Sequence, residues 1–143
     1  MMTLRRAQVE ELSAHALETS PAECCGLIGG TTDGQARTIY RLRNMASDPL
    51  VAYEAAAEDL FAAQRNMRER GEQLLAIYHS HPRAREPEPS ASDVRLAYYP
   101  SAIYLIIGLS GRGAQLRAFR INESAGRWEQ IDFRVLDEAE EAN

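Results

Sequence analysis

Two of the three histidines, His79 and His81, stand two residues apart with Ser80 between them. They directly follow the apolar run at residues 74–78, which is typical of a central strand. In an extended backbone, residues i and i+2 point to the same side and lie about 6.5 to 7 Å apart at Cα. Both imidazoles could therefore reach one metal ion. The alternative is a pair of surface histidines at the end of a strand.

An acidic side chain in the next segment, Asp93, is a candidate third ligand. It follows Ser90 by three residues, a spacing that also resembles a capping box at the start of a helix. The proline-containing loop at residues 82–89 can fold that start back over the end of the strand. Two histidines and one carboxylate leave a coordination position for water, as in catalytic rather than structural zinc sites. Ser90 could cap the helix or direct its hydroxyl into the site.

Such a site needs a base that takes a proton from water. Glu23 precedes the short apolar segment at residues 24–30, but it is one of 15 glutamates in the chain. Spacing alone does not select it, and a surface glutamate is the alternative.

The pattern of apolar residues predicts the elements that must position these side chains. We expect one α/β domain over residues 1–136, with about six strands and three helices, and an acidic tail at 137–143 that frays. The second helix should end at Gly71, a typical C-cap. The expected helices cover 4–19, 54–70 and 90–99, and the expected strands cover 24–30, 36–42, 74–78, 103–109, 115–121 and 127–135.

Composition narrows the possible functions. The 143 residues include 16 arginines but no lysine, which excludes a phosphate-loop lysine and a lysine Schiff base. The net charge of −5 argues against a nucleic-acid partner, since such proteins present a basic face. The chain has no apolar run long enough to span a membrane. Its two cysteines, Cys24 and Cys25, are adjacent and poorly placed for a disulfide, so we expect a cytoplasmic protein.

Taken together, three segments resemble the JAMM (MPN-plus) zinc metallopeptidase family. They are Glu23 with Cys25-Gly26-Leu27, then Tyr78-His79-Ser80-His81-Pro82, then Pro89-Ser90-Ala91-Ser92-Asp93. The resemblance covers roughly residues 4–135 and is greatest to the small stand-alone bacterial members. One departure is the loop at 82–89, which is one residue longer than the family's usual pattern. We expect the extra residue to be absorbed before the helix.

The resemblance implies a fold, a cofactor and a role for each residue of the motif. The fold would be a curved mixed β-sheet flanked by helices, similar to cytidine deaminases. His79, His81 and Asp93 would bind one zinc ion, with water in the fourth position. Glu23 would be the general base, and Ser90 would donate a hydrogen bond to the oxyanion or the water.

The resemblance also implies the substrate class. Family members hydrolyse amide or isopeptide bonds after the Gly-Gly tail of ubiquitin-like proteins, and the small bacterial ones resemble enzymes suited to sulfur-carrier proteins. The tail could add a strand to an exposed sheet edge. The sequence does not predict the oligomeric state.

Four other functions are compatible with parts of the pattern. A catalytically silent MPN-type interaction module is one, although such relatives usually lack the ligands that this chain retains. A zinc deaminase would need His-x-Glu and a later Pro-Cys-x-x-Cys. An iron oxygenase would use the same two histidines and one carboxylate. A thiol hydrolase would pair Cys24 or Cys25 with His79.

Overall fold

The computed structural model describes residues 1–95, 97 and 99–137 and contains three helices within them, α1 (Arg6–Thr19), α2 (Ala57–Arg70) and α3 (Ala91–Arg95). None of these helices has the length and apolar character needed to cross a membrane. Residues 138–143, most of the expected acidic tail, lie outside the described part. The strands are β1 (Thr3–Arg5), β2 (Cys25–Gly30), β3 (Ala36–Leu42), β4 (Gln73–His81), β5 (Ile103–Gly111), β6 (Gly113–Asn122), β7 (Arg127–Ile131) and β8 (Arg134–Leu136).

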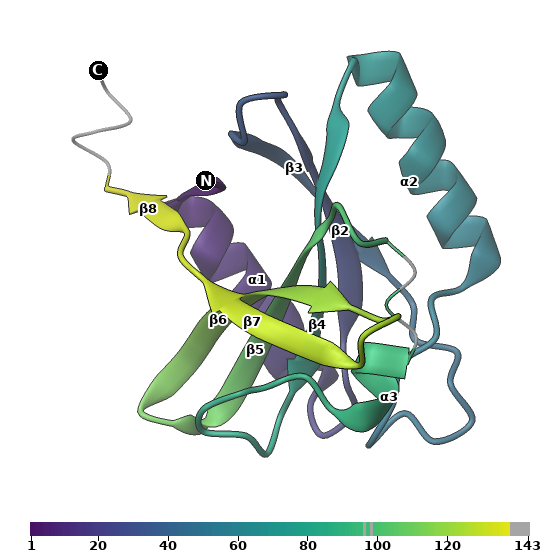
Figure 1. Ribbon diagram of the computed structural model, residues 1–143, viewed down its shortest axis with the longest axis vertical. Coiled ribbons are helices and arrows are strands. Elements are labelled where there is room, and N and C mark those ends of the chain that lie inside the picture. Colours follow the sequence, from purple (N-terminus) through teal and green to yellow (C-terminus); the bar gives the residue numbers. More distant parts are fainter. Residues whose placement is uncertain (96, 98, 138–143) are drawn as a thin grey trace.

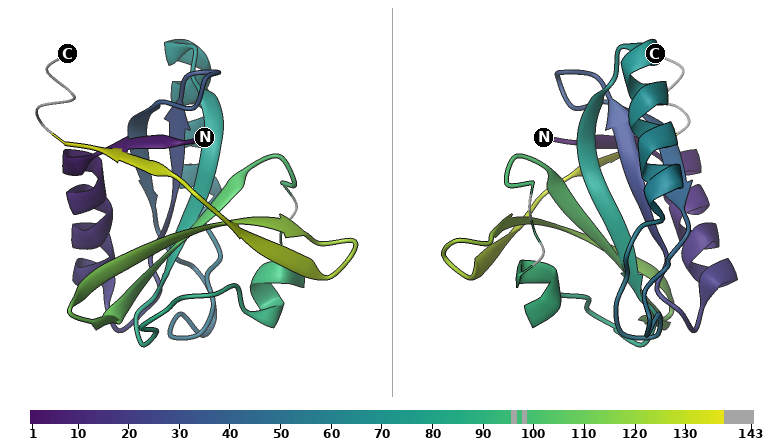
Figure 2. Two further views of the ribbon diagram at one scale, coloured as in Figure 1. Left: turned by 60° about the vertical axis from the view of Figure 1, so that its left-hand side comes forward. Right: turned by 90° about the vertical axis from the view of Figure 1, so that its right-hand side faces the viewer.

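Six of the strands form one mixed sheet in the order β3-β2-β4-β5-β6-β7. Only the central pair, β4 and β5, is parallel, and the other neighbours are antiparallel. The short strands β1 and β8 pair separately, in parallel. Helices α1 and α2 lie on opposite sides of the sheet, as the views in Figures 1 and 2 agree. This is the expected mixed sheet flanked by helices.

Several boundaries differ from the sequence expectation. The expected third helix at 90–99 is shorter, since α3 ends at Arg95 and Ala97 is not helical. The expected strand at 74–78 extends through His81, where it still pairs with β5.

Three further boundaries differ because long-range pairing competes with local pattern. The first helix begins at Arg6 rather than at residue 4, since residues 3–5 pair with β8. The second begins at Ala57, since Ala55 forms a β-bridge with Asn44. The last expected strand is divided after Ile131, where the chain leaves the main sheet to reach β1. The expected helix end at Gly71 is confirmed, with a left-handed φ of 65°.

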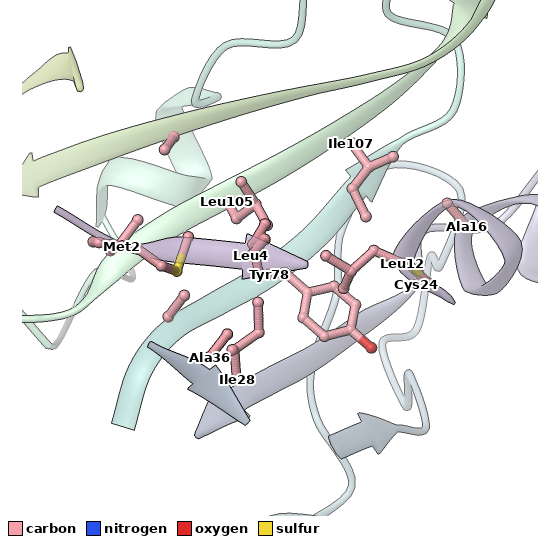
Figure 3. Close-up of a cluster of buried hydrophobic side chains, with 13 residues drawn as sticks. Met2, Leu4, Leu12, Ala16, Cys24, Ile28, Ala36, Tyr78, Leu105 and Ile107 are labelled. Atoms are coloured by element: carbon pink, nitrogen blue, oxygen red, sulfur yellow. The ribbon is translucent and has the colours of Figure 1, made fainter. Parts of the chain in front are cut away.

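Alternation along β4 divides its side chains between two hydrophobic clusters. Ala76 and Tyr78 face α1 and pack in a cluster that includes Leu12 and Leu105 (Figure 3). Ile77 belongs to the other cluster, with side chains of α2. Because the side-chain period of a strand is two, His79 and His81 continue the α2 side. The core therefore determines which face of the sheet carries the histidines.

A buried histidine on the α1 side gives a pH-dependence prediction. The Nδ1 atom of His15 lies 2.7 Å from the hydroxyl of Tyr78. Burial, together with the nearby Arg41 guanidinium, lowers the pKa of His15 to about 4. The unfolded chain then takes up a proton at a higher pH than the folded chain does, so His15 makes folding less favourable as the pH falls from about 6.5 towards 4.

We expect this effect to reach about 2 to 3 kcal/mol at pH 4.5, at about 1.4 kcal/mol for each pH unit between the two pKa values. The measurement is urea unfolding of the wild type and His15→Gln at pH 7.5 and pH 4.5. Other titrating groups cancel in the difference between the two proteins. The variant should lose less stability on acidification. Parallel losses in both proteins would contradict this assignment.

Candidate active site

The two histidines of β4 converge at the carboxyl end of the strand. Their Nε2 atoms are 3.1 Å apart. His79 is fully buried and His81 is partly exposed. The ring of Tyr53 stacks on that of His79, with centroids 4.5 Å apart and planes 25° apart. The strand and the stacked ring together fix the direction of the His79 side chain.

The loop after β4 and the start of α3 bring Asp93 to the same point. Its Oδ2 atom lies 3.1 Å from Nε2 of His79 and 3.1 Å from Nε2 of His81. The loop is held against β5, where the Ser110 amide donates to the carbonyl of Ala84. The longer loop therefore still brings the aspartate to the histidines.

Asp93 also forms the capping box that the sequence suggested. The Ser90 amide donates to Oδ2 of Asp93 at 2.8 Å, and the Asp93 amide donates to the Ser90 hydroxyl oxygen at 3.1 Å. Asp93 therefore caps the start of α3 and lies beside the two histidines at the same time, so both alternatives for this residue are realised. Because the Ser90 oxygen accepts this bond, its own proton remains available to another acceptor.

Glu23 reaches the cluster through the pairing of β2 with β4. Cys25 pairs with His79 in this antiparallel register, so two residues earlier Glu23 comes opposite His81. A carboxylate oxygen of Glu23 and a ring nitrogen of each histidine all lie within 4.8 Å of one another. The residue is only 5% exposed. Burial raises the pKa of Glu23 to about 7, opposed by the His81 charge and assisted by that of Asp93.

Two of the three candidate ligands, His79 and Asp93, have protonation states that suit a cation. Burial lowers the pKa of His79, which favours a neutral ring. Burial alone would raise the pKa of Asp93, but hydrogen bonds and charge interactions with the histidines hold it well below its usual range. Burial alone would lower the pKa of His81, but the interaction with Asp93 outweighs burial and raises it. A metal ion that binds this ring would displace its proton. An ionised carboxylate beside a neutral imidazole is what a metal ion requires.

The donor set and its spacing fit a metal ion of the size of zinc. Two ring nitrogens and one carboxylate oxygen form a triangle with edges of 3.1 Å. Ligand atoms of a tetrahedral zinc with bonds of about 2.0 to 2.1 Å are roughly 3.3 Å apart. Glu23, His79 and His81 likewise form a group that could hold an ion. The structure therefore contains a possible metal-binding site.

A groove of about 720 Å³ borders the cluster on the α2 side of the sheet. It reaches Ser92 and Asp93 at the start of α3 and is mostly apolar. Its walls are provided by β2, β4, α2 and the segment between β3 and α2. Among the lining residues are Leu27, Leu42, Ala52, Tyr53, Leu60, Met67, Leu74, Ile77 and Tyr104.

The structure disfavours the two cysteines as nucleophiles. Cys24 and Cys25 are each 1% exposed and unpaired. Burial raises the pKa of Cys24 to about 11 and that of Cys25 to about 12, so neither thiol forms a thiolate readily near neutral pH.

Three residues around the cluster were not singled out from the sequence. Ser80 is fully buried, and its hydroxyl accepts a hydrogen bond from the Cys24 amide at 2.8 Å, which joins the histidine strand to the residue after Glu23. Tyr53 and Asn44 lie in the irregular segment between β3 and α2. The position of Ser80 between the histidines could have marked it as part of the site. Tyr53 and Asn44 belong to no motif or periodic pattern that would mark them.

Comparison with known proteins identifies relatives over most of the chain. The model of a family described as prokaryotic homologs of the JAB domain matches residues 5–122. A desampylase of Haloferax volcanii is 32% identical over 92% of this chain and 91% of its own length. A probable TtuB-protein conjugate cleaving protease of Thermus thermophilus is 36% identical, over 82% and 74%. A CysO-cysteine peptidase of Mycobacterium tuberculosis is 30% identical, over 92% and 90%.

Solved structures share the fold. A protein of Desulfitobacterium hafniense, solved in solution, has a TM-score of 0.83 and 33% identity, over 96% of this chain and 94% of its own. A JAB1/MPN domain protein of Archaeoglobus fulgidus has a TM-score of 0.60 and 16% identity, over 95% and 98%. The second likeness concerns the fold alone.

Proposed function

The chain belongs to the prokaryotic homologues of the JAB domain, and we propose that it is a zinc-dependent hydrolase of amide or isopeptide bonds. Its substrate is the C-terminal Gly-Gly tail of a ubiquitin-like or sulfur-carrier protein. The observation that carries this proposal is the 3.1 Å triangle of His79, His81 and Asp93 with the buried Glu23 carboxylate beside it. The names of the relatives support the substrate class, since they are a desampylase, a probable TtuB-protein conjugate cleaving protease and a CysO-cysteine peptidase.

In this proposal His79, His81 and Asp93 hold one zinc ion. When bound, zinc lowers the pKa of its water to about 7 and polarises the scissile carbonyl. His79 contributes as a neutral ring whose direction is set by Tyr53, and Asp93 contributes as a carboxylate whose direction is set by the capping box at Ser90. These supporting contacts reduce the reorganisation needed on binding.

Glu23 and Ser90 then perform the proton transfer and the oxyanion stabilisation. The Glu23 carboxylate accepts a proton from the attacking water and delivers it to the nitrogen of the departing amine. Burial raises the pKa of Glu23 to about 7 before any cation binds, and the positive charge of zinc would lower it from there, which favours the carboxylate that accepts the proton. The Ser90 hydroxyl oxygen accepts a hydrogen bond from the Asp93 amide. Its O–H group donates a hydrogen bond to the carbonyl oxygen of the substrate as negative charge develops there.

The groove is the proposed place of the substrate tail. Because it reaches Ser92 and Asp93, an extended tail lying in it would bring its terminal carbonyl to the cluster. Its apolar walls suit the side chains that precede the glycines. We place the activity in a single domain over residues 1–136. We also place it in the cytoplasm, where the two free cysteines would remain reduced.

The test uses small carrier proteins of the ubiquitin-like fold whose Gly-Gly terminus is extended by one amino acid or joined to a lysine side chain. After incubation with the zinc-loaded enzyme, mass spectrometry should show loss of the extension. A chelator should abolish the reaction, whereas iodoacetamide should not. If the zinc-loaded protein cleaved neither a carrier nor a tail peptide, the result would instead support the catalytically silent interaction module.

The same assay tests whether the enzyme contacts the folded body of the carrier. We expect kcat/KM for an intact carrier to exceed that for its isolated tail peptide by at least about tenfold, since each further 1.4 kcal/mol of binding is tenfold in affinity. Equal values would show that the tail alone is recognised.

A further inference from the structure

Asn44, two residues after the end of β3, uses every hydrogen-bonding position of its side-chain amide. Its Nδ2 atom donates to the backbone carbonyl of Glu23 at 2.9 Å and to that of Ala52 at 3.0 Å. Its Oδ1 atom accepts from the amides of Ala46 and Glu54, each at 3.0 Å. One side chain thus joins the backbone of Glu23 to both sides of the segment at residues 45–54.

That segment holds Glu23 from its other side as well. The Glu23 amide donates to the carbonyl of Pro49 at 2.8 Å. Both backbone polar groups of Glu23 are therefore bound to Asn44 or to the loop that Asn44 closes. The same loop provides Tyr53, which stacks on His79, and it forms one wall of the groove.

We propose that Asn44 is a positioning residue for the reaction, which keeps Glu23 and the groove wall in one rigid unit. This inference rests on the proposed function for its kinetic consequence. Asn44 touches none of the reacting groups and acts through Glu23. A base displaced by about 1 Å can lose as much as 10²-fold in rate, so the backbone that carries the base must be fixed.

An asparagine is required here by its mixed donor and acceptor character. Two carbonyl oxygens need donors and two amides need an acceptor, and a primary amide supplies both. Aspartate has the same shape but only acceptors, so Asn44→Asp would leave the carbonyls of Glu23 and Ala52 facing a carboxylate. Asn44→Ala removes all four bonds. Asn122→Ala is a matched control, because Asn122 binds the Ala125 amide in the β6–β7 turn.

The kinetic test uses a fluorogenic peptide whose Gly-Gly terminus is joined by an amide bond to aminomethylcoumarin. Asn44→Asp should lower kcat about 10- to 100-fold with zinc content unchanged, and Asn122→Ala should behave as the wild type. In a Glu23→Gln background, adding Asn44→Asp should change the residual kcat less than about threefold, because the two act through one group. An equal loss in both backgrounds, or no loss in either, would overturn the proposal.

A second readout requires neither substrate nor metal. In hydrogen exchange, the Glu23 amide of Asn44→Asp should exchange at least about tenfold faster than in the wild type, while the Ile28 amide within β2 stays unchanged. An unchanged rate at Glu23, or equal acceleration at Ile28, would overturn the positioning role. If the wild type cleaves neither the peptide nor an extended carrier protein but the exchange result is as expected, the proposed function fails and the positioning role stands.

Discussion

Glu23→Gln should lower kcat by about 10² to 10⁴-fold and leave one zinc ion bound to each chain. Glutamine keeps the shape of the side chain but cannot accept the proton of water, and a general base usually contributes a factor of this size. The three proposed ligands form the 3.1 Å triangle, and Glu23 lies beside this triangle without being part of it. The loss should therefore concern the chemistry and not the metal. Single-turnover kinetics with elemental analysis of the same sample provides the measurement.

A matched control is Glu10→Gln, since Glu10 is exposed on α1, which packs on the opposite side of the sheet. Its kcat should equal that of the wild type. Full activity in Glu23→Gln would show that this carboxylate is not the base. Loss of zinc from Glu23→Gln would instead make it a ligand.

His79→Ala should remove the metal itself. It deletes one of the three proposed protein donors at a fully buried position. We expect zinc affinity to fall by more than the 10- to 100-fold that loss of a supporting residue usually causes. Hydrolysis should fall to background at substoichiometric zinc. Competition titration with a chromophoric chelator measures the affinity.

The control for this variant is His15→Gln, which replaces the buried histidine on the other side of the sheet. It should bind zinc as the wild type does. Retention of tight zinc binding by His79→Ala would contradict the assignment of this ring, and the same loss in both variants would point to general destabilisation.

The elements and one face of the site were accessible from sequence because they follow from local regularity. The two-residue period of β4 places His79 and His81 on one side, and the Ser90–Asp93 spacing marks the start of α3. The residues next to Glu23 in the sequence do not distinguish it from the other glutamates. It reaches the histidines through the antiparallel register of β2 with β4, a long-range pairing that only the resemblance to a family could suggest.

The remaining contributors lie where sequence has no period. Tyr53 and Asn44 belong to an irregular segment, and their partners are a histidine ring and backbone groups many residues away. The expected start of the second helix at residue 54 was wrong for the same reason, a long-range contact of this irregular segment. Residues 54–56 favour a helix by composition, but the bridge between Asn44 and Ala55 holds them in the loop.

The most direct test of the central claim is X-ray absorption at the zinc edge of the reconstituted protein. The account predicts one zinc per chain with two imidazole nitrogens and additional oxygen ligands, at about 2.0 to 2.2 Å. Sulfur at about 2.3 Å, or a spectrum without imidazole scattering, would contradict binding by His79, His81 and Asp93.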